Sequence, residues 1–435
     1  MDTGFWTQRL KDALDSYELC FTRERTKTFE AAEGDLLSKE VKEEEGISMR
    51  GIKAGKMVFS YTYEQGEEAA AALVENARTV MPFLDKDLSY AFPHAAGAYP
   101  TLDLYDEAGL RLDDDAKIEA LINMESTIRG FDARITTTRY CELRESEIQI
   151  TVINSDGLEA KGSKTVYALS GMAVAAQNNE EVSWYDWTWG FRYSDLAAPV
   201  LGTRIAEKAV SFLSGELLDT GTYTGLLTPA CACQILEILS PSFLSENLYK
   251  NKTRLKGKAG QKLFSEALTI SDSGTRGTGA FPFDGEGVPS RENVVVRQGV
   301  FEGFLYDMYY GNLFKKASTG NGVRPGIKEP PRCAARGFCI ESGQGKAGIE
   351  ELGNGVVIEE LMGTHMANPV TGDFSLGAIG HHYSGGTHIP FKGVIFSGNL
   401  FEVLSNVRAV GNDLTFFGSY GSPSLLMEGL KISGK

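Results

Sequence analysis

The sequence predicts an α+β protein with two domains. A mixed N-terminal domain with antiparallel strands and helices is expected over residues 1–217, and a β-rich C-terminal domain over residues 218–435. The chain has 435 residues, more than one ordinary hydrophobic core organises. It has 49 glycines but only 14 prolines, which indicates many tight turns and short strands. Helical and strand patterns are mixed as far as residue 213, whereas glycine-punctuated strand patterns dominate after Gly221.

The N-terminal domain is expected to begin with a helix, because Trp6, Leu10 and Leu14 recur at helical spacing. Strand-like runs follow, and the polar clusters 33–35 and 45–46 are expected to be the turns that separate antiparallel strands. The helices expected in this domain cover 5–14, 70–80, 118–122 and 203–213, and the strands cover 17–22, 56–62, 133–143, 145–153, 165–177 and 182–193.

Three of the four tryptophans lie within one expected strand: Trp184, Trp187 and Trp189. Aromatic-rich strands usually form the packed face of a sheet. We therefore expect these side chains to be ordinary core residues.

Charge and composition exclude several classes of protein. The net charge is −15 and the isoelectric point is near 5.0, so the surface repels phosphate backbones and anionic membranes. No run of 18 apolar residues indicates a membrane span. Residues 1–6 contain neither a basic nor an apolar signal region, and six cysteines in so long a chain do not form a disulfide scaffold. We expect a cytoplasmic protein with reduced thiols.

The histidines and cysteines do not form a recognisable metal motif. None of the five histidines belongs to a His-Glu-x-x-His sequence, and the adjacent His381 and His382 would point to opposite faces of a strand. One alternative remains, in which His365 or one of that pair meets His388 in space. Cys231 and Cys233 are two residues apart, which is not the spacing of zinc or redox cysteines, so we expect a buried apolar pair.

Two further patterns have ordinary structural explanations. The glycine-rich segment 274–279 lacks the Gly-Lys-Ser/Thr ending of a phosphate loop and the context of a dinucleotide site, so a flexible loop is favoured. Asp284 and Glu286 would share one face of a strand, where two carboxylates bind a cation or act as an acid and a base. Aspartate beside glycine is also a common turn, and the residues alone favour the turn.

The C-terminal half contains six short sequences in a characteristic order and spacing. They are FDGEG at 283–287, STGNGVR at 318–324, PVTGDFS at 369–375, SGNL at 397–400, VGND at 410–413 and GSPS at 421–424. Together they resemble the TldD/PmbA family, whose members are also described as modulators of DNA gyrase. The resemblance is clear over 221–434, fainter back to about 182, and only architectural before that.

The resemblance implies one of two kinds of subunit. The TldD kind is a metallopeptidase whose metal ligands come from a His-Glu-x-x-x-His motif and a later cysteine, and the PmbA or TldE kind shares its fold without those ligands. Here Pro229 replaces the first histidine, Ala230 the glutamate and Gln234 the second histidine. Proline and alanine offer no ligand atom, glutamine is a poor zinc ligand, and 413–424 contains no cysteine. The chain therefore resembles the PmbA kind, a pseudoenzyme subunit in which we expect no catalytic residue and no metal.

The same resemblance implies partners and a substrate. A PmbA-like chain forms a heterodimer with a TldD-like catalytic subunit, which holds the zinc, or a homodimer when that subunit is absent. The pair acts by proteolysis on unfolded peptides, including peptide-antibiotic precursors and an antitoxin in some bacteria. An extended peptide can add to an exposed sheet edge through main-chain hydrogen bonds. No direct contact with nucleic acid or membrane is expected.

Five residues of the matched sequences are expected to shape the substrate path or the subunit interface: Asp284, Glu286, Asn321, Arg324 and Asp373. Arg324 is expected to pair with Asp284 or Glu286. The alternative is a buried structural network made of the first four residues.

Two other functions remain open from the sequence. One is a binding or regulatory protein that acts on a toxin–antitoxin or gyrase system without peptidase activity. The other is a self-standing peptidase with a relocated metal or nucleophile.

Overall fold

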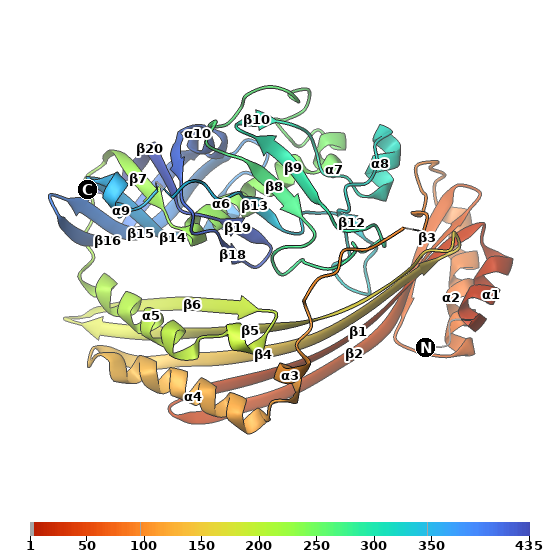
Figure 1. Ribbon diagram of the computed structural model, residues 1–435, viewed down its shortest axis with the longest axis horizontal. Coiled ribbons are helices and arrows are strands. Elements are labelled where there is room, and N and C mark those ends of the chain that lie inside the picture. The colour runs from red at the N-terminus through yellow and green to blue at the C-terminus, as the bar shows by residue number, and fades with distance from the viewer. Residues whose placement is uncertain (1–3, 96, 346) are drawn as a thin grey trace.

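A long, curved, antiparallel sheet forms the framework of the N-terminal half in the computed structural model, which describes residues 4–95, 97–345 and 347–435 (Figure 1). Residues 1–3, part of the segment used for the targeting expectation, lie outside the described residues. The strand order is β3-β2-β1-β4-β5-β6. The bounds are β1 Ser16–Ala32, β2 Asp35–Lys53, β3 Lys56–Thr62, β4 Ile135–Asn154, β5 Glu159–Gln177 and β6 Glu180–Gly190.

These strands are longer than the sequence patterns predicted. The expected strands 133–143 and 145–153 are one strand, β4, and Glu45-Gly46 lies inside β2 instead of forming a turn. A Cβ on Gly46 would lie 2.0 Å from Ile327 Cδ1, so close packing explains the glycine. Long stretches of these strands face solvent, and the charged residues in those stretches interrupt the apolar alternation.

Two pairs of helices cover one face of this sheet at its two ends. Helices α1 (Gly4–Ala13) and α2 (Glu67–Val80) share a core with Leu19 and Phe21 of β1. Helices α4 (Asp114–Phe131) and α5 (Ala198–Ser211) share another with Phe29 of β1. The expected N-terminal helices are therefore confirmed. The short elements are α3 Glu107–Arg111, η1 Met81–Phe83, η2 Tyr193–Asp195 and η3 Phe212–Ser214.

A small closed barrel organises the C-terminal half. Its sheet has the order β16-β15-β14-β7-β20-β17, and β16 also pairs with β20, which closes the ring. β7 and β14 are parallel, and the other neighbours are antiparallel. The bounds are β7 Gly221–Leu227, β14 Gly355–Met362, β15 Asp373–Ser384, β16 Thr387–Asn399, β17 Val407–Val410 and β20 Leu425–Ser433.

A second sheet packs with the barrel around one large core, and α6 (Pro229–Leu239) lies between them. Leu236 and Leu239 of α6 belong to this core together with Phe338 of the second sheet and Ile358 of the barrel. The order is β10-β9-β8-β13-β19-β18, and a small ladder joins β11 to β12. The bounds are β8 Ile270–Ser273, β9 Glu292–Arg297, β10 Val300–Phe301, β11 Gly322–Val323, β12 Arg332–Cys333, β13 Phe338–Ile340, β18 Thr415–Phe417 and β19 Tyr420–Ser422. The other helices are α7 Ser245–Tyr249, α8 Met308–Phe314, α9 Ile349–Leu352, α10 Leu400–Ser405, η4 Ser240–Phe243 and η5 Thr364–Met366.

The C-terminal half sits over the sheet face opposite the helices (Figure 1). Phe281 and Phe283 pack there against Cys20 of β1 and Val152 of β4. The α+β class with a β-rich C-terminal part is therefore confirmed. Among the described helices, none is both long and apolar enough to span a bilayer.

The three tryptophans of β6 do not share one environment. Trp184 is a core residue, stacked on Phe212 with ring centroids 5.2 Å apart. Trp187 lies 6.2 Å from the Phe417 ring, and Trp189 Nε1 donates to the carbonyl oxygen of Phe416 at 2.8 Å. The expectation of core packing holds for Trp184 only, because successive side chains of a strand alternate between faces and the other two contact the C-terminal half.

Candidate functional site

The substituted metal motif forms the first turns of α6, where its residues have structural uses. Thr228 Oγ1 accepts from the Cys231 N–H at 3.5 Å and caps the helix. Pro229 occupies the first turn, where a missing N–H costs nothing because that group has no partner within a helix. Pro229 and Ala230 are both half-buried.

Gln234 holds α6 against the barrel. Its Nε2 donates to the Leu361 carbonyl at 3.1 Å, and its Oε1 accepts from the Leu361 N–H at 3.3 Å. Both functional atoms of the amide are therefore occupied by β14. The Gln234 side chain therefore bonds both the N–H and the C=O of Leu361, as the backbone of a neighbouring strand would.

Cys231 and Cys233 are buried, as the sequence predicted. Cys233 Sγ contacts the Thr415 and Tyr420 carbonyl oxygens at 3.7 and 3.4 Å, so α6 is fixed to β18 and β19. Burial raises the pKa of both thiols, that of Cys233 to about 12, which disfavours the thiolate that metal binding needs. All six cysteines are free and buried.

The α6 side chains do not fit a zinc ion. Pro229 and Ala230 have no donor atom, and the Gln234 amide is engaged by the backbone. Across residues 4–95, 97–345 and 347–435, no three histidine, cysteine, aspartate or glutamate side chains converge as metal ligands would.

The histidine pair of β15 points to opposite faces, as expected. His382 lies against Tyr223, with ring centroids 5.8 Å apart. His381 lies 5.5 Å from the His388 ring, so His388 meets a member of the pair. His381 Nδ1 is 2.7 Å from Glu359 Oε1, and Lys208 of α5 pairs with the same carboxylate. This cluster connects α5 to the barrel.

A hollow of about 340 Å³ borders β6 and the β18 segment beside α6. Trp187 and Trp189 line one side, and Thr415 and Phe417 line the other. Residues 413–424, where the resemblance implies a late cysteine ligand, contain no cysteine.

Three of the predicted site residues, Asp284, Glu286 and Arg324, belong to a charge network between the two halves. Arg50 of β2 donates to Glu18 of β1 from Nε at 3.0 Å and from Nη2 at 2.5 Å. Its Nη1 donates to Glu286 Oε1 at 2.8 Å, and Glu286 Oε2 accepts from the Met308 N–H at 2.8 Å. The Glu18 and Glu286 side chains are 0% and 2% exposed, so these are desolvated ion pairs.

The partner predicted for Arg324 is wrong. Arg324 Nη2 pairs with Glu18, its Nη1 donates to Ser48 Oγ at 3.0 Å, and its Nε donates to the Gly285 carbonyl at 2.6 Å. Glu286 is already paired with Arg50 of β2. These pairings could not be predicted from the sequence, because each arginine pairs with a glutamate of the other half, far away along the chain.

Two aspartates, Asp284 and Asp307, extend the network and add two acidic groups to it. Asp284 accepts from the Gly322, Glu286 and Val288 N–H groups at 2.8–2.9 Å, so it does fold a turn. Burial and the neighbouring Glu286 raise the pKa of Asp284 above its usual range. The same two causes raise the pKa of Asp307, which caps α8 through the Tyr310 N–H, to about 7.

Asn321 and Asp373 lie in separate groups. Asn321 Nδ2 donates to Asp272 Oδ2 at 2.7 Å and to the Ala334 carbonyl at 2.9 Å, and Asp272 Oδ1 accepts from the Arg336 N–H at 2.8 Å. Asp373 is exposed at the start of β15, where its carboxylate accepts from Asn399 Nδ2 at 2.8 Å.

Sequence reasoning missed the N-terminal members of the network, Glu18 and Arg50. They are directly opposite in the β1–β2 register. A signal was present, because Glu18 interrupts the apolar run from Tyr17 to Phe21. A charged side chain inside such a run indicates a buried ion pair when a partner of opposite charge faces it.

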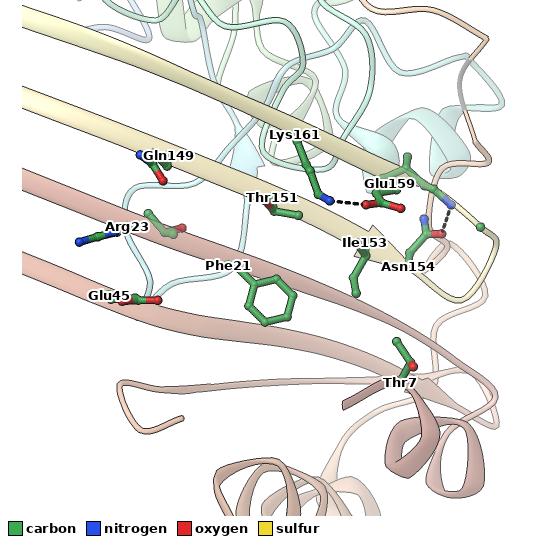
Figure 2. Close-up of a pocket in the computed structure, with 13 residues that line it drawn as sticks. Thr7, Phe21, Arg23, Glu45, Gln149, Thr151, Ile153, Asn154, Glu159 and Lys161 are labelled. Carbon is green, nitrogen blue, oxygen red and sulfur yellow. Dashed lines mark hydrogen bonds and ion pairs between the residues drawn. The ribbon is translucent and has the colours of Figure 1, made fainter. Parts of the chain in front are cut away.

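Another hollow lies on the helix-facing side of the N-terminal sheet (Figure 2). It measures about 530 Å³ and includes Arg23 and Lys161. Arg23 pairs with Glu43 at 2.6 Å, and Lys161 with Glu159 at 2.6 Å, so both of these cations already have an acidic partner. None of the predicted site residues lines it.

Three domain families match the sequence. They are PmbA/TldA metallopeptidase domain 1 over residues 17–80, the central domain over 108–213 and the C-terminal domain over 220–434. The chain is 28% identical over 390 residues, 88% of each chain, to an uncharacterized protein of Methanocaldococcus jannaschii. It is also 28% identical to the metalloprotease PmbA of Escherichia coli O157:H7 over 341 residues, 77% of this chain and 73% of that one.

The solved structure of TldE from Thermococcus kodakarensis has the same fold, with a TM-score of 0.90 and 22% identity over 98% of both chains. The fold and the matched domains define a protein with the architecture of this group of metallopeptidases. The chain belongs to the PmbA/TldD family.

Proposed function

We propose that this chain is a non-catalytic subunit of the PmbA/TldE type, which acts in the cytoplasm with a TldD-like zinc peptidase on unfolded peptides. The main support for this proposal is the set of residues in the first turns of α6. The helix is present, yet Pro229 and Ala230 stand where the family resemblance requires a ligand and a catalytic glutamate.

The packing around α6 supports this assignment. The amide of Gln234 bonds Leu361, and the thiols of Cys231 and Cys233 are buried with raised pKa values. Each of these groups stabilises the fold in a way that a metal ligand could not do at the same time. The zinc ion is therefore assigned to the TldD-like partner.

The edge of β6 offers a route for an extended peptide. Among the described strands, β6 pairs only with β5, and its Trp187 and Trp189 line the hollow beside α6. A peptide that pairs with a strand edge uses main-chain hydrogen bonds, so it must be unfolded but needs little sequence specificity. The net charge of −15 disfavours nucleic acid as a ligand in its place.

The test measures cleavage of an unfolded peptide by the chain alone, by a TldD-like partner alone and by the mixture. We expect no cleavage by the isolated chain and chelator-sensitive cleavage by the mixture that exceeds that of the partner alone. A partner variant without its motif glutamate serves as the control. Chelator-sensitive cleavage by the isolated chain would contradict the proposal.

A further inference from the structure

A hollow of about 350 Å³ lies between the helices α1 and α2 and the hairpin of β2 and β3. Figure 1 shows both helices beside the β3 end of the sheet. Ligand pockets are typically concave and lined mainly by apolar side chains with a few polar groups. This hollow, named here the apolar hollow, has such a lining, and its apolar members are Ala13, Leu14, Ala54, Val74, Ala77, Met81 and Pro82.

The polar side chains that line the apolar hollow are all cationic: Lys53, Lys56 and Arg78. Among the described residues that line it, none is acidic, although the chain has a net charge of −15. The neighbouring carboxylate of Asp15 accepts from the Ala54 N–H at 2.7 Å and is therefore engaged by the hairpin turn. A local excess of positive charge attracts an anionic group.

The two lysines are held by neutral partners. Lys53 Nζ donates to the carbonyl oxygen of Ala13 at 2.7 Å. Lys56 Nζ donates to the carbonyl oxygens of Met81 and Pro82 at 3.3 and 3.0 Å. An ammonium group has three N–H donors and a carbonyl oxygen carries no net charge, so these contacts leave both the charge and further donors for a ligand.

Arg78 and Phe83 extend the site toward solvent. Arg78 Nη1 is 3.8 Å from Glu75 Oε2, and the two side chains are 61% and 71% exposed, so this ion pair is weak. Phe83 directly follows the lining residue Pro82 and is 87% exposed. An exposed aromatic ring beside an apolar hollow offers further apolar surface to a bound chain.

We propose that the apolar hollow binds a medium-chain carboxylate, with its chain against the apolar lining and its carboxylate among Lys53, Lys56 and Arg78. An apolar cavity of about 150 Å³ holds benzene, so the 350 Å³ here has room for a chain of about eight to ten carbon atoms. The single negative charge is matched by charge-assisted hydrogen bonds from the cations. No residue of α6 or β6 lines this hollow among those described, so the inference goes beyond the proposed function and does not rest on it.

Isothermal titration of the full-length chain with sodium decanoate, kept below its micelle concentration, tests the site. Each methylene removed in the series decanoate, octanoate and hexanoate should weaken binding by about two- to fourfold, because less apolar surface is buried. The neutral 1-octanol should bind about tenfold more weakly than octanoate, because it makes no charge-assisted hydrogen bond.

Two variants at exposed positions test the head group and the chain separately. Arg78→Glu places a negative charge at the site and should weaken decanoate binding about tenfold or more. Arg408→Glu is the matched control and should leave binding unchanged, because Arg408 lies on β17, is 64% exposed and faces Glu428 at 3.6 Å. Phe83→Ser should weaken binding of decanoate more than that of hexanoate, because only the longer chain reaches the ring. Circular dichroism checks that each variant is folded.

The proposal would be overturned if the parent chain showed no saturable binding of decanoate. It would equally be overturned if Arg78→Glu and Arg408→Glu weakened binding to the same extent, since the effect would then follow from total charge. An affinity that did not depend on chain length, or was the same for octanoate and 1-octanol, would also contradict it. Binding of a peptide with an apolar C-terminus, but of none of the free carboxylates, would assign the hollow to a different ligand.

Discussion

Replacing Arg50 tests whether the charge network stabilises the contact between the two halves. Arg50→Ala removes two hydrogen bonds to Glu18 and one to Glu286, and the Arg50 side chain is only 6% exposed. Glu18 keeps its pair with Arg324, but Glu286 keeps only the N–H of Met308. Removing one partner of a buried ion pair leaves an uncompensated charge, and we expect a loss of about 3–5 kcal/mol in the free energy of unfolding.

Urea unfolding, followed by tryptophan fluorescence, measures this loss. Arg23→Ala is the matched control, since Arg23 lies on β1 of the same sheet and pairs with Glu43 while 53% exposed. Its unfolding midpoint should remain almost unchanged because exposed ion pairs contribute little. If Arg50→Ala shifts the midpoint no more than Arg23→Ala does, the network does not stabilise the fold as argued.

Three further predictions concern the acids, α6 and the thiols. The pKa of Asp307 is raised to about 7 from 3.8, so the folded state holds the proton more tightly and the free energy of unfolding falls as pH rises through this interval. Asp307→Asn keeps the helix cap and should make that fall shallower between pH values of about 4 and 7; an unchanged slope in urea unfolding would contradict the assignment. Gln234→Ala leaves both backbone groups of Leu361 without this partner and should cost about 1–3 kcal/mol, whereas Gln234→Glu, which can accept but not donate when ionised, should cost a comparable amount. A variant as stable as the parent in thermal unfolding would show that Gln234 is not a structural partner. Cys231 and Cys233 are buried with raised pKa values, so a thiol reagent should label them only in denaturant, and rapid labelling of the native chain would contradict the packing described.

Local patterns were sufficient to predict the class of fold and most helices. α2 and α5 are amphipathic, and one face of each packs on the sheet. The length of β4 was missed because Arg144 and Glu145 sit where the apolar alternation breaks. Register with β1 and β5, not the local sequence, extends this strand across the break.

The candidate site was predictable only where its contacts are local. The turn made by Asp284 follows from its neighbours in sequence, and the buried state of Cys231 and Cys233 follows from the apolar segment around them and from a spacing that fits no metal or redox site. The pairing of Arg324 with Glu18 was not predictable, because 306 positions separate the two residues. Only the docking of the second half on the sheet brings them together.

The zinc content of the chain purified alone, without chelator or affinity-tag histidines, tests most directly whether this chain lacks a metal site. We expect negligible zinc, because the turn that begins with Pro229 and Ala230 has no ligand set. Roughly one zinc per chain, together with peptide cleavage that a chelator abolishes, would contradict it and would identify this subunit as a peptidase in its own right.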